Sequence, residues 1–218
     1  MNNKYEERLK EIVDLSFSSL YGKINGGLIS VENEASLQLQ LSFIIKTIGD
    51  LFIYQKEEIF SIELEKPVLL KKGKFLKSDS EKAKIDIFIS IENIISEERR
   101  RCAIELKFFK KANAREPNNR YDVFKDLSNL EKYGDFADFG VLLVATDHDH
   151  YRSHEAYSVN TKEFDFRHGK SYSGGTKLTY RTDKPYGDPI TLNGSYDFLW
   201  RKPAKGINFM QLEVNTQS

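Results

Sequence analysis

The apolar residues of this chain change their spacing near residue 58, and this change restricts the folds open to it. Over about residues 4–20 and 33–51 they recur at helical spacing, as in amphipathic helices. Later they alternate or run together, which is typical of strands. Strands are expected over 59–64, 84–91, 102–109 and 139–145. The last of these is continuously apolar, as in a strand covered on both faces, and a helix is expected before it over 120–133.

The order of these elements predicts an α/β (α+β) fold with a mixed β-sheet flanked by helices. Residues 165–214 are rich in Gly, Tyr, Thr and Asp. They predict short strands and turns that form a C-terminal antiparallel β extension. No repeat and no Pro/Gly/Ser-rich linker divides the 218 residues, so we expect a single domain over residues 1–218.

Composition excludes several classes of protein. Aromatic residues make up 12% of the chain, which supplies a core and argues against disorder. The single cysteine, Cys102, excludes an internal disulfide and a cysteine-rich zinc module, and it suits a reducing compartment. The first residues are too acidic and too briefly apolar for a signal peptide, and no window reaches about 18 uninterrupted apolar residues. A cytoplasmic protein without a membrane span is expected.

Charge is unevenly distributed along the chain, although its formal total is zero. Residues 66–112 carry 13 Lys and Arg against 7 Asp and Glu, whereas residues 1–65 carry 6 against 11. A basic middle segment is compatible with a face that binds a polyanion such as nucleic acid. It is more often a solvated, lysine-rich hairpin, so charge alone does not decide between the two.

An acidic residue interrupts the apolar strand expected over 84–91, and two charged residues share one face of the strand over 102–109. Asp86 stands among isoleucines, and burying a carboxylate there without partners is costly. Glu105 and Lys107 are two apart and point to the same face, because side chains alternate along a strand. If the two strands pair as a hairpin, Asp86 lies beside Glu105. The alternative is a half-exposed hairpin face with a cross-strand ion pair.

Two carboxylates and an ammonium group suit metal-assisted cleavage of a phosphodiester. Mg²⁺ prefers oxygen ligands and takes only one or two protein carboxylates. A metal held by Asp86 and Glu105 would neutralise charge on a scissile phosphate and acidify a bound water. Lys107 would position that water, or stabilise the transition state as a fixed positive charge.

At these residues the chain resembles the PD-(D/E)XK nuclease superfamily, which includes most type II restriction endonucleases. Ile-Asp-Ile at 85–87 and Ile-Glu-Leu-Lys at 104–107 match its acidic residue and its Glu-x-Lys motif in kind and order, between an upstream and a downstream helix. Ile85 stands where the family name has proline, a departure that many members share. The resemblance covers about residues 33–146. It implies a restriction-endonuclease-like fold that carries a metal-dependent phosphodiesterase site.

The resemblance also implies roles for particular side chains. Asp86, Glu105 and Lys107 would be catalytic residues. Asp86 and Glu105 would hold Mg²⁺, for which Mn²⁺ would substitute.

Members of the superfamily often place another glutamate on the helix before the core sheet. Glu34 fits that place better than Glu32, because Glu34 lies on the inward stripe of its own helix and Glu32 precedes the helix. Glu34 would then be a further metal ligand and catalytic residue, supported by a hydrogen bond from Gln38 one turn on. Its alternative role is that of a first-turn acid that favours the helix dipole.

Basic residues follow the Glu-x-Lys strand into the next loop and helix. They are Lys110, Lys111, Arg115 and Arg120. Beside a phosphate-cleaving site they would contact the nucleic-acid backbone, which positions DNA without reading its sequence. A solvated loop is the alternative. Asp126, further along, resembles an acidic position frequent on this helix in related sequences, and no chemical role is assigned to it.

Three histidines form a competing site. His148, His150 and His154 fall within seven residues after the strand over 139–145. His-x-His can ligate zinc, so a zinc hydrolase is the alternative enzyme. The order is not His-Glu-x-x-His, and an exposed loop that contacts substrate is favoured instead. Cys102 is expected to be a small, buried hydrophobic residue.

Taken together, the residues predict a Mg²⁺-dependent endonuclease that hydrolyses phosphodiester bonds in double-stranded DNA, in restriction or defence. The alternative is a module on the same fold that binds nucleic acid or a protein without cleaving. Intact Asp86, Glu105 and Lys107 favour the enzyme, because a degenerate site would be expected to lose at least one of them. RNA stays open as a substrate, and a homodimer is expected if both strands are cut symmetrically.

Overall fold

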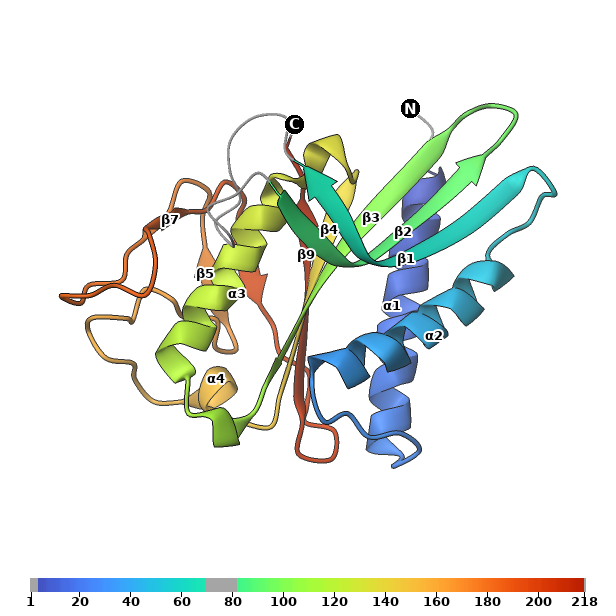
Figure 1. Cartoon of the computed structure of the whole chain (residues 1–218). Helices are drawn as coiled ribbons and strands as arrows, with labels where there is room; N and C mark the ends of the chain where they lie inside the picture. The colour runs from blue at the N-terminus through green and yellow to red at the C-terminus, as the bar shows by residue number, and fades with distance from the viewer. Residues whose placement is uncertain (1–3, 70–81, 218) are drawn as a thin grey trace.

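The computed structural model describes residues 4–69 and 82–217 (Figure 1). Part of the basic middle segment, residues 70–81, therefore lies outside the described residues. One sheet contains the strands β1 Glu58–Leu69, β2 Lys82–Asn93, β3 Arg99–Phe109, β4 Phe139–Thr146 and β9 Asn208–Asn215. The long helices are α1 Lys4–Asn25, α2 Glu34–Leu51 and α3 Glu116–Glu131. No helix in the described ranges is both long enough and apolar enough to cross a membrane.

The five-stranded sheet has the order β1-β2-β3-β4-β9 and contains both strand directions. β1, β2 and β3 are antiparallel neighbours, β3 and β4 are parallel, and β9 is antiparallel to β4. The connection from β3 to β4 carries α3, because parallel neighbours need a long crossover. This confirms the expected α/β class with a mixed sheet flanked by helices.

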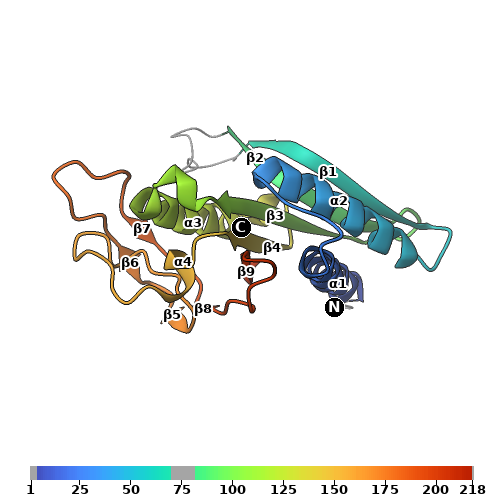
Figure 2. The ribbon, with the colours of Figure 1, turned by 90° about the horizontal axis from the view of Figure 1, so that it is seen from below.

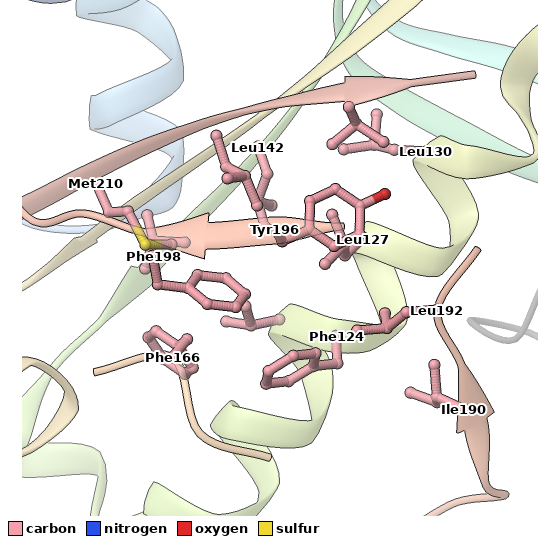
Figure 3. Close-up of a cluster of buried hydrophobic side chains, with 14 of the residues drawn as sticks. Phe124, Leu127, Leu130, Leu142, Phe166, Ile190, Leu192, Tyr196, Phe198 and Met210 are labelled. Atoms are coloured by element: carbon pink, nitrogen blue, oxygen red, sulfur yellow. The ribbon is translucent and has the colours of Figure 1, made fainter. Parts of the chain in front are cut away.

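Helices cover the sheet on both faces (Figure 2). α1 and α2 pack on one face, where Ile104 and Leu106 of β3 are fully buried. α3 and the C-terminal segment pack on the other face, around Phe124 and Phe198 (Figure 3). Because side chains alternate along β3, the charged side chains of Glu105 and Lys107 face α3.

The side chains of the β1–β2 hairpin exchange faces of the sheet partway along its length. Leu64 pairs with Ile87, but the next residue, Glu65, has a φ of +52°, which non-glycine residues seldom adopt. Beyond this point Ile85 belongs to the cluster around α3, whereas Ile87 belongs to the cluster around α1 and α2. The change of face therefore occurs at Asp86.

Two elements differ from the sequence-based expectation. α3 begins at Glu116 rather than at residue 120, because Pro117 occupies its first turn, where the missing N–H removes no helical hydrogen bond. The C-terminal segment forms the expected short antiparallel strands, in two separate two-stranded sheets, but its last strand, β9, joins the main sheet. The short elements are η1 Lys111–Asn113, η2 Tyr133–Asp135, α4 His150–Ser153, β5 Lys170–Tyr172, β6 Lys177–Leu178, β7 Ile190–Thr191 and β8 Tyr196–Phe198.

A buried ion pair joins α1 to the start of β1. Arg8 donates two hydrogen bonds to the Glu58 carboxylate, at 2.8 and 3.2 Å. The Tyr5 hydroxyl and the Tyr54 N–H donate to the same carboxylate. Despite burial, the Arg8 hydrogen bonds lower the pKa of Glu58 to about 2.

We expect Arg8→Met to lower the free energy of unfolding by about 3–5 kcal/mol at neutral pH, because it leaves a buried carboxylate without its cation. Wild-type stability should also depend on acid. With a folded pKa of about 2 and an ordinary value of 4.5, the contribution of Glu58 is complete above pH 4.5 and is lost as the pH falls toward 2. Urea unfolding at several pH values measures both effects.

The control for this prediction is Lys46→Met, which removes an exposed ion pair with Asp50 on α2. Exposed pairs contribute about 0–1 kcal/mol, so the control should change stability little. Equal losses in the two variants would contradict the role given to the buried pair.

Candidate active site

Asp86 and Glu105 lie where β2 and β3 separate. The paired register of these strands ends at Ile87 opposite Ile104, so the next residue on each strand is Asp86 on β2 and Glu105 on β3. Asp86 Oδ2 accepts a hydrogen bond from the Leu106 N–H at 2.7 Å. The carboxylate of Asp86 therefore bonds to the backbone of β3 just past the point where the regular ladder stops.

Glu105 and Lys107 both face α3, and neither is a surface residue. Asp86, Glu105 and Lys107 are 8%, 1% and 9% exposed. Glu105 Oε1 accepts a hydrogen bond from the Tyr133 hydroxyl at 2.8 Å. Burial and the charge of Glu105 raise the pKa of Tyr133 far above its usual value, so this hydroxyl remains a donor. The alternative of a half-exposed hairpin face does not agree with this burial.

The ammonium group of Lys107 is held by an acidic residue of α3. Its Nζ lies 2.5 Å from Asp126 Oδ2 and 4.0 Å from Glu34 Oε2, and it donates to the Leu106 carbonyl at 2.9 Å. Burial alone would lower the pKa of Lys107, but Asp126, Glu34 and Glu105 together raise it above its usual value. Lys107 is therefore a fixed cation.

Glu34 is the first residue of α2 and lies next to Lys107. A capping box between Asn33 and Ser36 fixes the start of the helix, and Glu34 Oε2 accepts from the Phe108 N–H at 3.3 Å. Partial burial raises the pKa of Glu34, and this effect outweighs the opposing charge of Lys107.

Glu32 and Gln38 lie near Glu34 in sequence but contact other residues. Glu32 pairs with Lys110 at 3.1 Å, outside the site. Gln38, expected to support Glu34, instead donates to the Asp86 carbonyl at 2.7 Å and to Glu65 Oε1 at 3.0 Å. Gln38 thus links α2 to the point where the β1–β2 hairpin changes face.

The carboxylates of Asp86 and Glu105 suit a metal ion that prefers oxygen ligands, such as Mg²⁺. Asp86 and Glu105 supply oxygen donors from two adjacent strands, which is the kind and number of protein ligands that Mg²⁺ takes. Within residues 4–69 and 82–217, no three His, Cys, Asp or Glu side chains are grouped as a metal site. Glu34 lies 4.0 Å from Lys107 and is not grouped with Asp86 and Glu105 in this part of the chain, so a third ligand is not preformed.

A cavity of about 380 Å³ adjoins Lys107 on the α3 side. Its walls come from the start of α2, the end of β3, the turn that follows, α3 and one residue of the C-terminal segment. The charged and aromatic side chains among them are Glu34, Lys107, Arg115, Asp122, Lys125, Asp126 and Tyr186.

The four basic residues that follow the Glu-x-Lys strand differ in exposure. Lys110, Lys111 and Arg115 are at or near the surface. Arg120 is 2% exposed and donates to the carbonyls of Thr161 and Phe164, at 2.9 Å each. The expected phosphate contact of Arg120 is therefore wrong, because the guanidinium group is buried and engaged within the protein.

The three histidines line a second surface cavity of about 630 Å³. His148 lies 3.1 Å from Glu116, and the ring of His150 lies 4.3 Å from that of His154. Burial and the neighbouring histidines lower the pKa of His150 to about 4. The rings pack against one another, and the described residues contain no three-residue metal group here either.

Cys102 is fully buried, and burial raises the pKa of its thiol well above its usual value.

Asp126 and Tyr133 are parts of the site that sequence reasoning did not assign. Asp126 had a visible signal in the sequence, since it lies on the inward stripe of its helix between Val123 and Leu130. In the structure it is 1% exposed. Tyr133 had no such signal, because its contact with Glu105 depends on how the segment after α3 packs on the sheet.

No family model, curated protein or solved structure matches the chain. The likeness to PD-(D/E)XK nucleases thus rests on the site residues themselves.

Proposed function

We propose that this chain is a Mg²⁺-dependent endonuclease that hydrolyses phosphodiester bonds in DNA, on a restriction-endonuclease-like fold, as a cytoplasmic enzyme of restriction or defence. One observation carries the proposal. Two buried carboxylates, Asp86 and Glu105, and a buried ammonium group, Lys107, come together where two strands separate. Even when they are paired, charged groups are costly to remove from water, so the burial of these three together favours a function.

The residues divide the chemical work between them. Asp86 and Glu105 would hold Mg²⁺, which when bound supplies charge neutralisation at the phosphate and a more acidic water. Lys107 keeps its proton, because the surrounding carboxylates raise its pKa, so it serves as a cation for the developing negative charge rather than as a base. Asp126 sets the position of that cation, at 2.5 Å from Nζ.

One observation favours the alternative of a module that binds without cleaving. The ion pair between Lys107 and Asp126 is buried, and a buried pair can serve the fold alone. In that case the Lys107 ammonium would have no part in a reaction.

Incubation of the purified chain with plasmid and phage DNA decides between the two functions. The enzyme should cleave DNA with Mg²⁺ or Mn²⁺ and leave it intact with EDTA. A parallel incubation with RNA tests the other polymer. Binding of DNA without any cleavage in either metal would favour the module.

The exposed basic residues should act on binding and not on chemistry. Lys110→Ala, Lys111→Ala and Arg115→Ala should each weaken DNA binding and reduce the slope of log affinity against log salt by about 0.9 per lost phosphate contact. Mg²⁺ affinity should not change. Fluorescence anisotropy over a range of salt concentrations measures the slope.

Lys56→Ala is the matched control, because Lys56 precedes β1 and its side chain is 91% exposed. It should leave the slope unchanged. If the three variants bind DNA at low salt as the control does, these residues form a solvated surface without a role in binding.

A further inference from the structure

The C-terminal segment contributes Tyr186 to the lining of the cavity beside Lys107. The Tyr121 hydroxyl of α3 donates to the Asp188 carbonyl at 2.9 Å. A Cβ at Gly187 would lie 2.4 Å from the Tyr121 ring, so only glycine allows this close approach. These contacts place Tyr186 at the wall of the cavity.

Tyr186 is held in place but keeps much of its ring accessible. Its hydroxyl is 3.3 Å from Asp122 Oδ2 and accepts a hydrogen bond from Arg115 at 3.3 Å. Its ring meets that of Tyr121 edge to face, with centroids 5.5 Å apart. Tyr186 is 40% exposed, so a ring fixed at its edges remains open to a flat ligand.

The cavity is lined by three acidic and three basic side chains, and two of the acids are paired with lysines. Asp122 is neutralised by Lys125 at 2.6 Å, and Asp126 by Lys107 at 2.5 Å. The remaining charges are those of Glu34, 4.0 Å from Lys107, and of Arg115, whose exposed guanidinium has donors for a phosphate beyond the one that Tyr186 accepts.

We propose that this cavity binds one unpaired nucleotide of the DNA strand, next to the phosphate that is cleaved. Its base stacks on Tyr186 and its phosphate contacts Arg115. The inference rests on the proposed nuclease function and adds the class of substrate, which is DNA with an unpaired or extruded nucleotide at the site.

The size of the cavity supports a nucleotide rather than a base pair. About 380 Å³ is near the lower end of small-molecule sites, which hold roughly 300–1,000 Å³. The free energy needed to extrude a paired nucleotide from a duplex is about equal to the free energy gained when its base stacks on one aromatic ring. A nucleotide that is already unpaired avoids this cost and should therefore be preferred.

Binding to two pools of short duplexes of randomised sequence tests the inference. The pools are identical except for one unpaired nucleotide, and binding is measured in EDTA by fluorescence anisotropy. The wild-type chain should bind the pool with the unpaired nucleotide about tenfold more tightly, the contribution of one stacked base. Tyr186→Ala should remove this preference, and Tyr186→Phe should keep it because the ring remains.

Phe43→Ala is the control for loss of an exposed ring, since Phe43 lies on α2 and is 66% exposed. It should keep the preference for the unpaired nucleotide. A fluorescent 2-aminopurine at the unpaired position should be quenched in the wild-type complex but not with Tyr186→Ala.

Equal affinity of the wild-type chain for both pools would overturn the inference, as would equal losses on both pools with Tyr186→Ala. Cleavage in Mg²⁺ separates this failure from failure of the proposed function. Cleavage without a preference removes only the nucleotide site, and a preference without cleavage removes only the nuclease. If the chain neither binds the pools in EDTA nor cleaves them in Mg²⁺, both are wrong.

Discussion

Asp86→Asn and Glu105→Gln should each lower the rate of DNA cleavage by a factor on the order of a thousand or more. The reason is electrostatic. Each change keeps an oxygen that accepts the existing hydrogen bond, from the Leu106 N–H or the Tyr133 hydroxyl, but removes the negative charge that would hold Mg²⁺. Loss of charge stabilisation worth about 4 kcal/mol corresponds to that factor. Single-turnover cleavage measures the loss, and calorimetry should show weaker Mg²⁺ binding.

The fold should survive these changes, which circular dichroism and urea unfolding can verify. Asp138→Asn is the matched control, because Asp138 also accepts a backbone hydrogen bond, from Arg101 at 2.7 Å, and lies outside the site. It should cleave normally. Unchanged Mg²⁺ affinity in both site variants would remove the assignment of the carboxylates as metal ligands.

Lys107→Ala should retain DNA binding and lose cleavage by a factor on the order of a hundred or more, which is typical of removing one electrostatic stabiliser. A catalytic cation is needed in the transition state more than in the bound complex. Lys107→Arg should rescue little, because a wide planar group replaces a compact ammonium. Single-turnover cleavage with enzyme in excess separates the chemical step from product release.

The single variant also leaves Asp126 buried without its cation, which destabilises proteins by about 3–5 kcal/mol. A double variant, Lys107→Met with Asp126→Asn, removes both charges and should recover most of this stability. If Lys107 serves only the fold, cleavage should return together with stability. If it acts on the reaction, the double variant should be stable and still inactive.

Local patterns in the sequence predicted much of the architecture. Alternating and helical spacing located the long helices and the first four strands of the sheet, because these patterns follow from which faces are buried. The pairing of Asp86 with the Glu-x-Lys strand could be expected for the same reason, since a hairpin between adjacent strands leaves few alternatives. The strand β9, distant in sequence, could not be placed on the sheet without the tertiary structure.

The parts of the site that the sequence did not reveal depend on packing between distant segments. Arg120 looked like its basic neighbours, yet the first turns of α3 bury it against Thr161 and Phe164. Tyr186 lies in a polar segment without periodic spacing, and only the docking of that segment on α3 brings it to the cavity. Charge in a sequence shows which residues could bind phosphate, but burial decides which of them remain available.

Cleavage of supercoiled plasmid by the wild-type chain and by Glu105→Gln, purified in parallel and compared in Mg²⁺ and in EDTA, tests the central claim most directly. The wild-type chain should nick or linearise the plasmid only with Mg²⁺, and Glu105→Gln should leave it supercoiled under both conditions. Equal cleavage by the two proteins, or no cleavage by the wild-type chain, would contradict a phosphodiesterase centre at Asp86, Glu105 and Lys107.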